Sequence, residues 1–158
     1  MRLPRSALLF TLALPAAALA DEPCQVLAVA SGDRLTCRLA DQRRVEVHLS
    51  GIEAPRPGEP YAEVSKVNLQ RLAEGHGATL VRPRRLDSGD VSAAVWVEPA
   101  DCPGCGHTLD IGRAQLAVGM ARWHADAPQG EEERAQYSFE EHEARARKVG
   151  LWRPPAQP

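Results

Sequence analysis

The sequence predicts an α+β domain that is mainly β, with five strands and three helices. Two observations support this class. Short apolar or alternating stretches, each bounded by turn-forming residues, are typical of strands. Longer stretches that run without a helix breaker and end at glycine are typical of helices. The predicted order along the chain is three strands, a helix, two strands and two helices.

The first three strands are expected to be antiparallel neighbours. Residues 25–30 and 35–39 alternate or cluster apolar side chains on either side of Ser31-Gly32-Asp33, a triplet that favours a turn. Residues 44–49 alternate polar with apolar side chains, as expected for a strand with one buried face. These stretches predict two consecutive hairpin connections.

The boundaries of the other elements are clearer, because proline or glycine residues lie between them. They are a helix over 61–74, a short strand over 78–81, a strand over 91–97, a helix over 109–118 and a last helix over 131–148. The last helix is the best marked, because glutamates crowd its first turn and basic residues its last, as the helix dipole favours. Five short strands with a helix between the third and the fourth follow the order of the OB-fold, a small and partly open barrel.

The N-terminus is typical of a bacterial export signal. Arg2 and Arg5 precede an apolar run that ends in Ala18-Leu19-Ala20. The run is shorter than the ~20 residues of a membrane-spanning helix, which favours cleavage before Asp21 over anchoring. The predicted organisation is a signal peptide over 1–20, one OB-fold domain over 21–152 and a disordered Pro-rich tail over 153–158. Such a protein is periplasmic or secreted.

The charge balance is unfavourable for tight nucleic-acid binding. Residues 21–158 carry 17 Lys and Arg against 21 Asp and Glu, whereas sequence-independent affinity comes from neutralising phosphates with basic side chains. Residues 81–85 form the only dense basic stretch, and Arg84 and Arg85 are its candidates for contacts with nucleic acid. The alternative is that this stretch is a solvated loop between strands.

The four cysteines favour disulfides over a metal site in an exported protein. Cys102 and Cys105 are close enough in sequence to form a bridge within one loop. A hairpin centred on Gly32 places Cys37 opposite Ala28, so the sequence does not force a bridge between Cys37 and the first cysteine, Cys24. Two alternatives use the same loop. A zinc site would need Cys102, Cys105, His107 and a fourth ligand, and a thioredoxin-like role would need a βαβ unit that the chain lacks.

Five segments of the chain resemble the staphylococcal nuclease family, in the family's order. They are "ASGDRLTCRL", "VHLSGIEAP", "GEPYAEVSKVNLQRL", "DIGRAQLAVGMARW" and "EEHEARARKVGLW", and they cover nearly the whole of residues 21–152. The resemblance implies an OB-fold and a calcium-dependent phosphodiesterase, in which carboxylates hold the metal, a glutamate activates water and two arginines bind the phosphate. The alternative is an unrelated OB barrel with similar turns.

The resemblance implies a partial metal site. Asp33 matches the first metal-binding aspartate, Glu53 matches the second carboxylate, and Ala54 matches a residue that contributes only its backbone carbonyl. Oxygen ligands of this kind suit a hard cation such as Ca²⁺. Arg34 takes the place of a usual threonine and competes with a cation, and it is also a candidate for nucleic-acid contact. Asp33 serves equally well as a simple turn residue.

The resemblance also shows that the catalytic positions are substituted. His48 and Asp90 stand at the two arginine positions, and Arg56 stands at the general-base position. Glu59 is a possible displaced base, and Arg84, Arg85 or a protonated His48 are possible substitutes for the missing arginines. Each rescue requires a backbone rearrangement, and active sites lose rate steeply when a group is displaced by ~1 Å.

The tryptophans offer a weaker signal for base stacking. Trp96 and Trp152 are expected in the core, whereas Trp123 lies near the place where family members carry tyrosines over the bound base.

The sequence therefore predicts a domain with a degenerate phosphodiesterase site that acts as a binding module, for single-stranded nucleic acid with low affinity or for a protein partner. The alternative is an active calcium-dependent endonuclease for DNA or RNA with a site rearranged around Asp33, Glu53 and Glu59.

Overall fold

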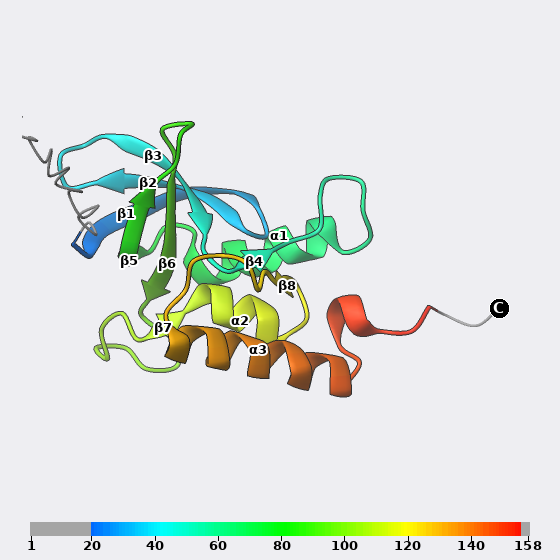
Figure 1. Ribbon diagram of the computed structural model, residues 1–158. Coiled ribbons are helices and arrows are strands. Elements are labelled where there is room, and N and C mark those ends of the chain that lie inside the picture. The colour runs from blue at the N-terminus through cyan, green and yellow to red at the C-terminus, as the bar shows by residue number, and fades with distance from the viewer. Residues whose placement is uncertain (1–19, 156–158) are drawn as a thin grey trace, which may run out of the picture.

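The computed structural model describes residues 20–155, and five of its strands form a barrel. These are β1 (Glu22–Ser31), β2 (Arg34–Leu39), β3 (Arg44–Leu49), β5 (Gly77–Arg85) and β6 (Val91–Val97). They follow the order β3-β2-β1-β5-β6, and parallel pairing of β3 with β6 closes the sheet on itself (Figure 1). The predicted α+β class and the OB-fold topology, with a helix between the third and fourth barrel strands, are confirmed.

The first hairpin has a different register from the one expected. Two irregularities, between Val26 and Ala28 and between Val29 and Ser31, shift the pairing so that Cys37 lies opposite Val26, not Ala28. The prediction was wrong because β-bulges leave no clear mark in a short apolar strand. The shift places Cys24 diagonally across from Cys37, and the two residues form a disulfide with their Cα atoms 5.7 Å apart.

The fourth barrel strand is longer than expected. The sequence predicted a short strand over 78–81, but β5 continues through the basic stretch to Arg85, so this stretch is not a loop. An irregularity between Val81 and Arg84 interrupts the pairing with β6, and Arg82 adopts a positive φ of 49° within it. Such a bulge accommodates Pro83, which cannot donate a hydrogen bond to a neighbouring strand.

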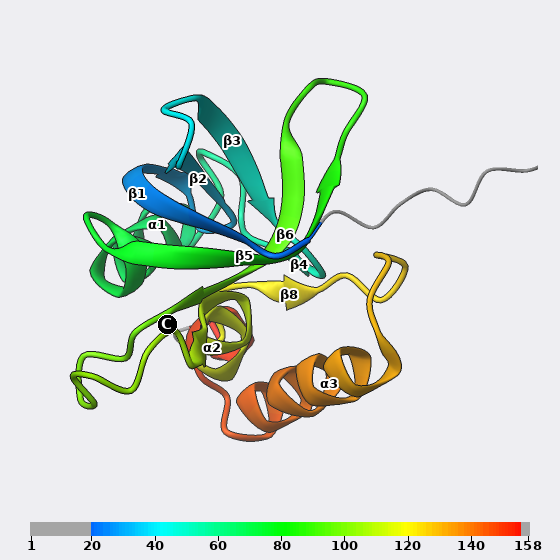
Figure 2. The ribbon, with the colours of Figure 1, turned by 90° about the vertical axis from the view of Figure 1, so that its left-hand side faces the viewer.

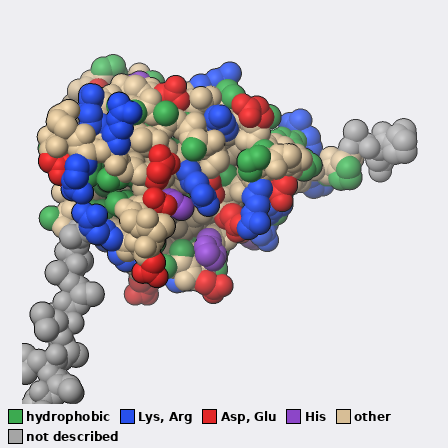
Figure 3. Space-filling model, turned by 90° about the horizontal axis from the view of Figure 1, so that it is seen from above, with side chains coloured by type: hydrophobic (Ala, Val, Ile, Leu, Met, Phe, Trp, Pro, Cys, Tyr) green, Lys and Arg blue, Asp and Glu red, His purple; other side chains and the backbone are tan. Residues whose placement is uncertain are grey.

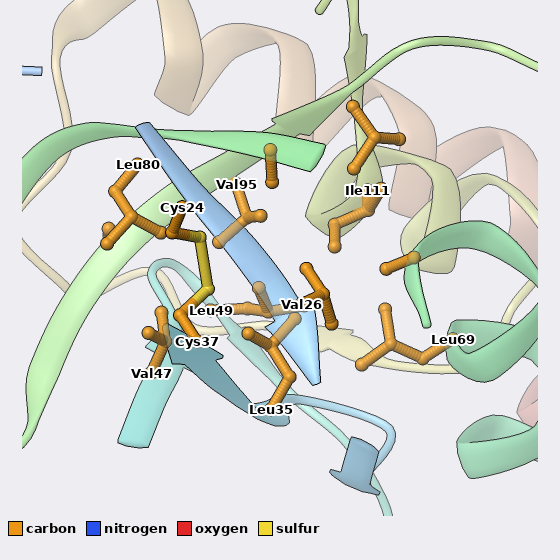
Figure 4. Packing of buried hydrophobic residues seen from close by; sticks show 14 of the residues in the cluster. Cys24, Val26, Leu35, Cys37, Val47, Leu49, Leu69, Leu80, Val95 and Ile111 are labelled. Carbon is orange, nitrogen blue, oxygen red and sulfur yellow. A yellow bond between two sulfur atoms is a disulfide. The ribbon is translucent and has the colours of Figure 1, made fainter. Parts of the chain in front are cut away.

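The barrel interior is filled by the apolar faces of the strands. In β2, for example, Leu35, Cys37 and Leu39 are buried while the intervening residues face outward. Figure 4 shows the Cys24–Cys37 disulfide among these side chains, with Leu69 and Ile111 extending the cluster toward the helices. The alternation expected of a strand with one buried face therefore places every other residue of β2 and β3 on the outer surface.

Three α-helices lie outside the barrel, and they are α1 (Ala62–Ala73), α2 (Ile111–Ala117) and α3 (Glu131–Ala146). Helix α1 packs against β1, α2 packs against β6, and α3 packs on α2 (Figure 2). The expected helix over 109–118 was too long, because Leu109 and Asp110 form the short strand β7 (Leu109–Asp110), which pairs with β6. Asp110 then caps α2, accepting hydrogen bonds from the backbone N–H groups of Gly112 and Arg113.

Three short elements complete the fold, and two of them pair to join the segment after β3 to the C-terminal half. Strand β4 (Ile52–Glu53) pairs with β8 (Arg122–Trp123), and the 3-10 helix η1 (Gly150–Trp152) follows α3. Within residues 20–155, no helix has the length and apolar character needed to cross a bilayer. The predicted signal peptide lies almost entirely outside the described residues, as does the end of the predicted tail.

Candidate functional site

Hydrogen bonds from buried and partly buried polar residues of α1 and α2 fix the turn between β1 and β2. Gln115 of α2 is fully buried and donates hydrogen bonds to the carbonyl oxygens of Gly32 (2.7 Å) and Ser65 (3.1 Å). Asn68 of α1 donates to the Gln115 amide oxygen, and the Ser65 hydroxyl donates to the Met120 carbonyl oxygen. We call Gly32, Ser65, Asn68, Gln115 and Met120 the buried frame, because they fix the backbone of the turn that presents Asp33.

The Asp33 carboxylate is engaged by the protein at both oxygens. Its Oδ1 atom accepts a hydrogen bond from the Ser31 hydroxyl (2.6 Å), and its Oδ2 atom accepts one from the Ala54 backbone N–H (3.0 Å). Asp33 thus joins the β1–β2 turn to the segment after β4. This supports the turn role that the sequence left open, and it leaves fewer lone pairs for a cation.

Asp33 and Glu53 line the same surface pocket of about 460 Å³. Its charged lining consists of these two carboxylates together with Arg34 and Arg56, so the charges balance. The Arg56 guanidinium lies 3.7 Å from the Glu53 carboxylate, although both side chains are mostly exposed. The two metal-ligand positions of the family are therefore brought to one pocket, together with two cations that compete for their charge.

The residues at the two arginine positions are bonded to each other. His48 Nε2 lies 3.1 Å from Asp90 Oδ2, and each side chain is roughly a third exposed. Hydrogen bonds from the Ser88 side chain and, second, from His48 hold the pKa of the Asp90 carboxyl below its ordinary value, and the Arg34 charge adds to the effect. The structure thus brings together two residues that are 42 positions apart in the sequence, and their side chains are within hydrogen-bonding distance of each other.

The outer barrel face around this pair carries a row of cross-strand neighbours. Arg34 lies opposite His48, His48 lies beside Ser92, and Ser92 lies opposite Arg84. Arg85 lies opposite Val91 in the adjacent position. Seen from above in Figure 3, basic and acidic side chains are interspersed on the surface and do not form one continuous basic patch.

Neither Arg56 nor Glu59 points to a rearranged catalytic centre. Glu59 Oε2 accepts a hydrogen bond from the Arg56 backbone N–H (2.8 Å), and the Glu59 N–H donates to the Arg56 carbonyl oxygen (2.9 Å). Glu59 therefore closes the loop after Pro55, and it is not part of the pocket lined by Asp33 and Glu53.

The donor set does not fit a calcium ion well. Ca²⁺ takes six to eight oxygen ligands in proteins. Within residues 20–155, no three side chains of His, Cys, Asp or Glu gather closely enough to hold a metal ion. Asp33 is committed to two protein hydrogen bonds, and Glu53 lies beside Arg56.

The tryptophans serve mainly structural contacts. Trp123 packs against the core and donates from Nε1 to Gln129 Oε1 (2.9 Å). The Arg145 guanidinium lies 4.3 Å from the Trp152 ring centroid, and Arg122 lies 5.6 Å from it. Trp96 and Trp152 are half-buried, not fully in the core as the sequence predicted, because each lies where helices meet the sheet or the chain end.

The zinc alternative is not supported, because Cys102 and Cys105 form a disulfide. His107 of the same loop lies beside the Thr79 hydroxyl, at 2.8 Å from Nδ1.

Some residues that shape the site had no signal in the sequence. Gln115 and Ser65 resemble ordinary helix residues, and only the fold reveals that they meet under the β1–β2 turn. Ser88 lies in the turn over residues 87–90, and nothing in the sequence indicates that its hydroxyl oxygen accepts a hydrogen bond from the Asp90 N–H.

A comparison with known families places the chain. The family described as "Staphylococcal nuclease homologue" matches residues 46–154, which is more than half of the sequence. The chain belongs to the staphylococcal nuclease family. Members of this family are calcium-dependent nucleases that bind nucleic acid.

A relative of this chain is also named as a nuclease. It is named "Uncharacterized endonuclease", from Haemophilus influenzae, and it is 25% identical over 145 residues, which cover 92% of this chain and 74% of the relative. The match to this relative thus extends over the barrel and the C-terminal helices. The match to the family spans β3 to η1 and includes His48, Arg56 and Asp90.

Proposed function

We propose that this chain is an exported staphylococcal-nuclease-like domain whose phosphodiesterase site is degenerate and which acts as a binding module. The observation that carries the proposal is the bond between His48 and Asp90, at 3.1 Å. A pair of arginines would present two cations to a phosphate. This pair presents a carboxylate whose pKa is lowered, so it is ionised at neutral pH and repels a phosphate.

The expected loss of rate is large. Loss of one preorganised electrostatic donor costs about 10² to 10³ in rate, and general-base catalysis contributes about 10² to 10⁴. Both arginine positions and the base position are substituted, and Glu59 is tied to the backbone of Arg56. Even though groups that act as a unit are not additive, the remaining rate is expected to be small.

The exposed arginines support nucleic acid as one ligand class. Arg34 and Arg84 flank the His48–Ser92 row, and Arg85 follows on β5. A single strand crossing this face would meet Arg34 and Arg84, whereas Arg85 pairs with buried Val91 and points to the other side of the strand. We expect weak binding that falls as salt rises, because Asp90 and the net negative charge oppose it. A protein partner is the other ligand class, and it predicts no binding of nucleic acid at low salt.

A second candidate function is an active calcium-dependent endonuclease. It is favoured by the relative named an endonuclease and by the presence of Asp33 and Glu53 in one pocket. In that case Glu59 would have to leave its hydrogen bond to the Arg56 N–H to act as a base.

The decisive experiment is digestion of single-stranded DNA by protein purified from Asp21 onward, with Ca²⁺ or with chelator. The Asp33→Ala variant serves as the control for a contaminating nuclease. We expect no cleavage above background in any sample. Calcium-dependent cleavage that disappears in Asp33→Ala would establish the second candidate and reject the first.

A triple variant tests the reason for inactivity. His48→Arg, Arg56→Glu and Asp90→Arg together restore the residue types of the family, and we expect calcium-dependent cleavage well above that of the parent protein. The matched control is Arg38→Glu, on the outer face of β2, which changes one exposed charge away from the pocket. Absence of cleavage in a folded triple variant would show that Arg34 or the engaged Asp33 also prevents catalysis.

Export is tested separately, by determining the N-terminus of the protein recovered from bacterial periplasm or medium. Cleavage before Asp21 is the expected result, and recovery of the intact N-terminus with the cells would reject the export signal.

A further inference from the structure

The two disulfides of this protein lie in opposite environments. Cys24 and Cys37 are 8% and 0% exposed and lie in the barrel core. Cys105 is exposed and Cys102 is half-buried, in the loop between β6 and β7. The Cα atoms are 5.7 Å apart in the first bridge and 5.6 Å apart in the second, so the spacing of the backbones is the same. The difference between them is access to solvent.

The loop that carries Cys102 and Cys105 is independent of the core. Among the described residues, no residue from 98 to 108 belongs to the buried hydrophobic cluster. Local hydrogen bonds shape the part of the loop around the bridge, and the His107 side chain contacts the Thr79 hydroxyl of β5. The Cys105 N–H donates to the Cys102 carbonyl oxygen (3.1 Å), and the Gly104 N–H donates to Glu98 Oε1 (2.9 Å). Opening the bridge therefore removes no apolar surface from the core.

The second bridge is also a weak constraint on the unfolded chain. A disulfide stabilises mainly by limiting the unfolded ensemble, and the effect grows with the length of the closed loop. The separation is 3 residues for Cys102–Cys105 and 13 residues for Cys24–Cys37. The barrel therefore depends little on the exposed bridge.

We propose that Cys102–Cys105 is a thiol–disulfide exchange site that accepts electrons from a dithiol, whereas Cys24–Cys37 remains oxidised. A thiolate of the dithiol attacks Sγ of Cys105, the more exposed residue, and the S–S bond breaks. Cys102 leaves as a thiolate and takes a proton. The second thiol of the partner then displaces Cys105 from the mixed disulfide. The net result is two thiols on this protein and one disulfide on the partner.

The surroundings of the loop do not activate either cysteine as a nucleophile, so the site suits slow thiol–disulfide exchange and not rapid redox catalysis. No α-helix begins at Cys102 or Cys105, so the helix N-terminus that lowers the pKa of many reactive thiols is missing. The Glu98 carboxylate bonded to the Gly104 N–H adds a negative charge beside the bridge. The nucleophile must therefore come from the partner dithiol.

The test is reduction of the folded protein by dithiothreitol at neutral pH, with samples quenched by acid, alkylated and analysed by peptide mass spectrometry. We expect Cys102 and Cys105 to become alkylated at least about 100-fold faster than Cys24 and Cys37, with an unchanged circular dichroism spectrum. Simultaneous reduction of both bridges, or resistance of both until the protein unfolds, would overturn the proposal.

Two matched variants test which sulfur is attacked. Cys102→Ser leaves Cys105 as a free thiol, and Cys105→Ser leaves Cys102. We expect the Cys102→Ser variant to form a mixed disulfide with oxidised glutathione several-fold faster, because the remaining thiol is more exposed. Equal or reversed rates would reject Cys105 as the attacked residue. A Cys102→Ser/Cys105→Ser double variant should keep the parent melting temperature to within about 2 °C, and a large decrease would show that the bridge is structural.

Discussion

The buried frame and the surface above it, which carries His48 and Asp90, differ in burial and in how their polar groups are bonded. Below the β1–β2 turn, Gln115 is fully buried and its amide bonds to Gly32, Ser65 and Asn68. Above the turn, His48 and Asp90 pair with each other at a partly exposed position. The frame fixes the turn that presents Asp33, whereas the surface above it carries the partly exposed pair of His48 and Asp90.

The difference teaches that the shape and the chemistry of this site have separate physical origins. A buried polar group without a partner costs about 1–3 kcal/mol, so a change in the frame threatens folding. Exposed charges contribute little to stability, so they can be exchanged while the fold is kept. The residues on this surface can thus change without a change in the turn below them.

The largest expected effect comes from breaking the frame at Gly32. A Cβ atom added there would lie 1.8 Å from Ser65 Oγ and 2.9 Å from the Ala54 Cβ atom. Gly32→Ala should lower the free energy of unfolding by about 3 kcal/mol, the upper end of the usual cost of overpacking. Denaturant unfolding measures this loss.

The matched control is Gly77→Ala, where the nearest atom to the added Cβ lies 3.6 Å away, on His107. A change of less than about 1 kcal/mol is expected there. Equal effects of the two substitutions would contradict the special role of the Gly32 position.

The next effect comes from removing the amide of Gln115. Gln115→Met keeps an unbranched side chain of similar length but removes the donor to the Gly32 carbonyl oxygen and the acceptor of the Asn68 amide. We expect a loss of about 2 kcal/mol in the free energy of unfolding, measured by urea denaturation. Gln136→Met on α3, a partner only of exposed Glu132, is the control and should change little. A neutral Gln115→Met would show that the network does not hold the turn.

A smaller, pH-dependent effect is expected at Asp110, which caps the helix that carries Gln115. Burial raises the pKa of Asp110 above its ordinary value of 3.8. The stabilisation that comes from this raised pKa, which favours the protonated carboxyl in the folded state, is therefore fully present below pH 3.8. It is lost as pH rises through the folded-state pKa. Asp110→Asn retains a capping oxygen and removes this titration. The stability of the parent minus that of the variant should fall with rising pH, and a difference that rises with pH would contradict the assignment.

The smallest effect is expected on the charged surface, and it has the opposite sign. The pKa of Asp90 is lowered, first by its hydrogen bond with Ser88 and then by that with His48. The stabilisation is therefore present above pH 3.8 and is lost as pH falls through the folded-state pKa. Asp90→Asn should lower the melting temperature only slightly at pH 6 and not at all at strongly acidic pH. A large loss at pH 6 would show that the surface pair supports the fold.

The sequence predicted the strands and helices of the barrel because their periods and breakers are local. Alternation in residues 44–49 and the charges at the ends of the last helix act within a few residues. The errors lie where the signal is not local. The bulges that shift Cys37 from Ala28 to Val26 depend on packing of the whole hairpin, and β5 extends through the basic stretch because β6 pairs with it.

The sequence by itself predicted the family and the topology, and the resemblance assigned His48, Arg56 and Asp90 to the family's catalytic positions, because such assignments depend on residue order alone. Only the tertiary structure decided what those residues do now. In the structure, His48 lies within hydrogen-bonding distance of Asp90, and the Glu59 carboxylate accepts a hydrogen bond from the Arg56 N–H. Both carboxylate oxygens of Asp33 also accept hydrogen bonds. Hydrogen bonds between residues far apart in the chain depend on distances that only the packed barrel sets, so no local pattern could have predicted them.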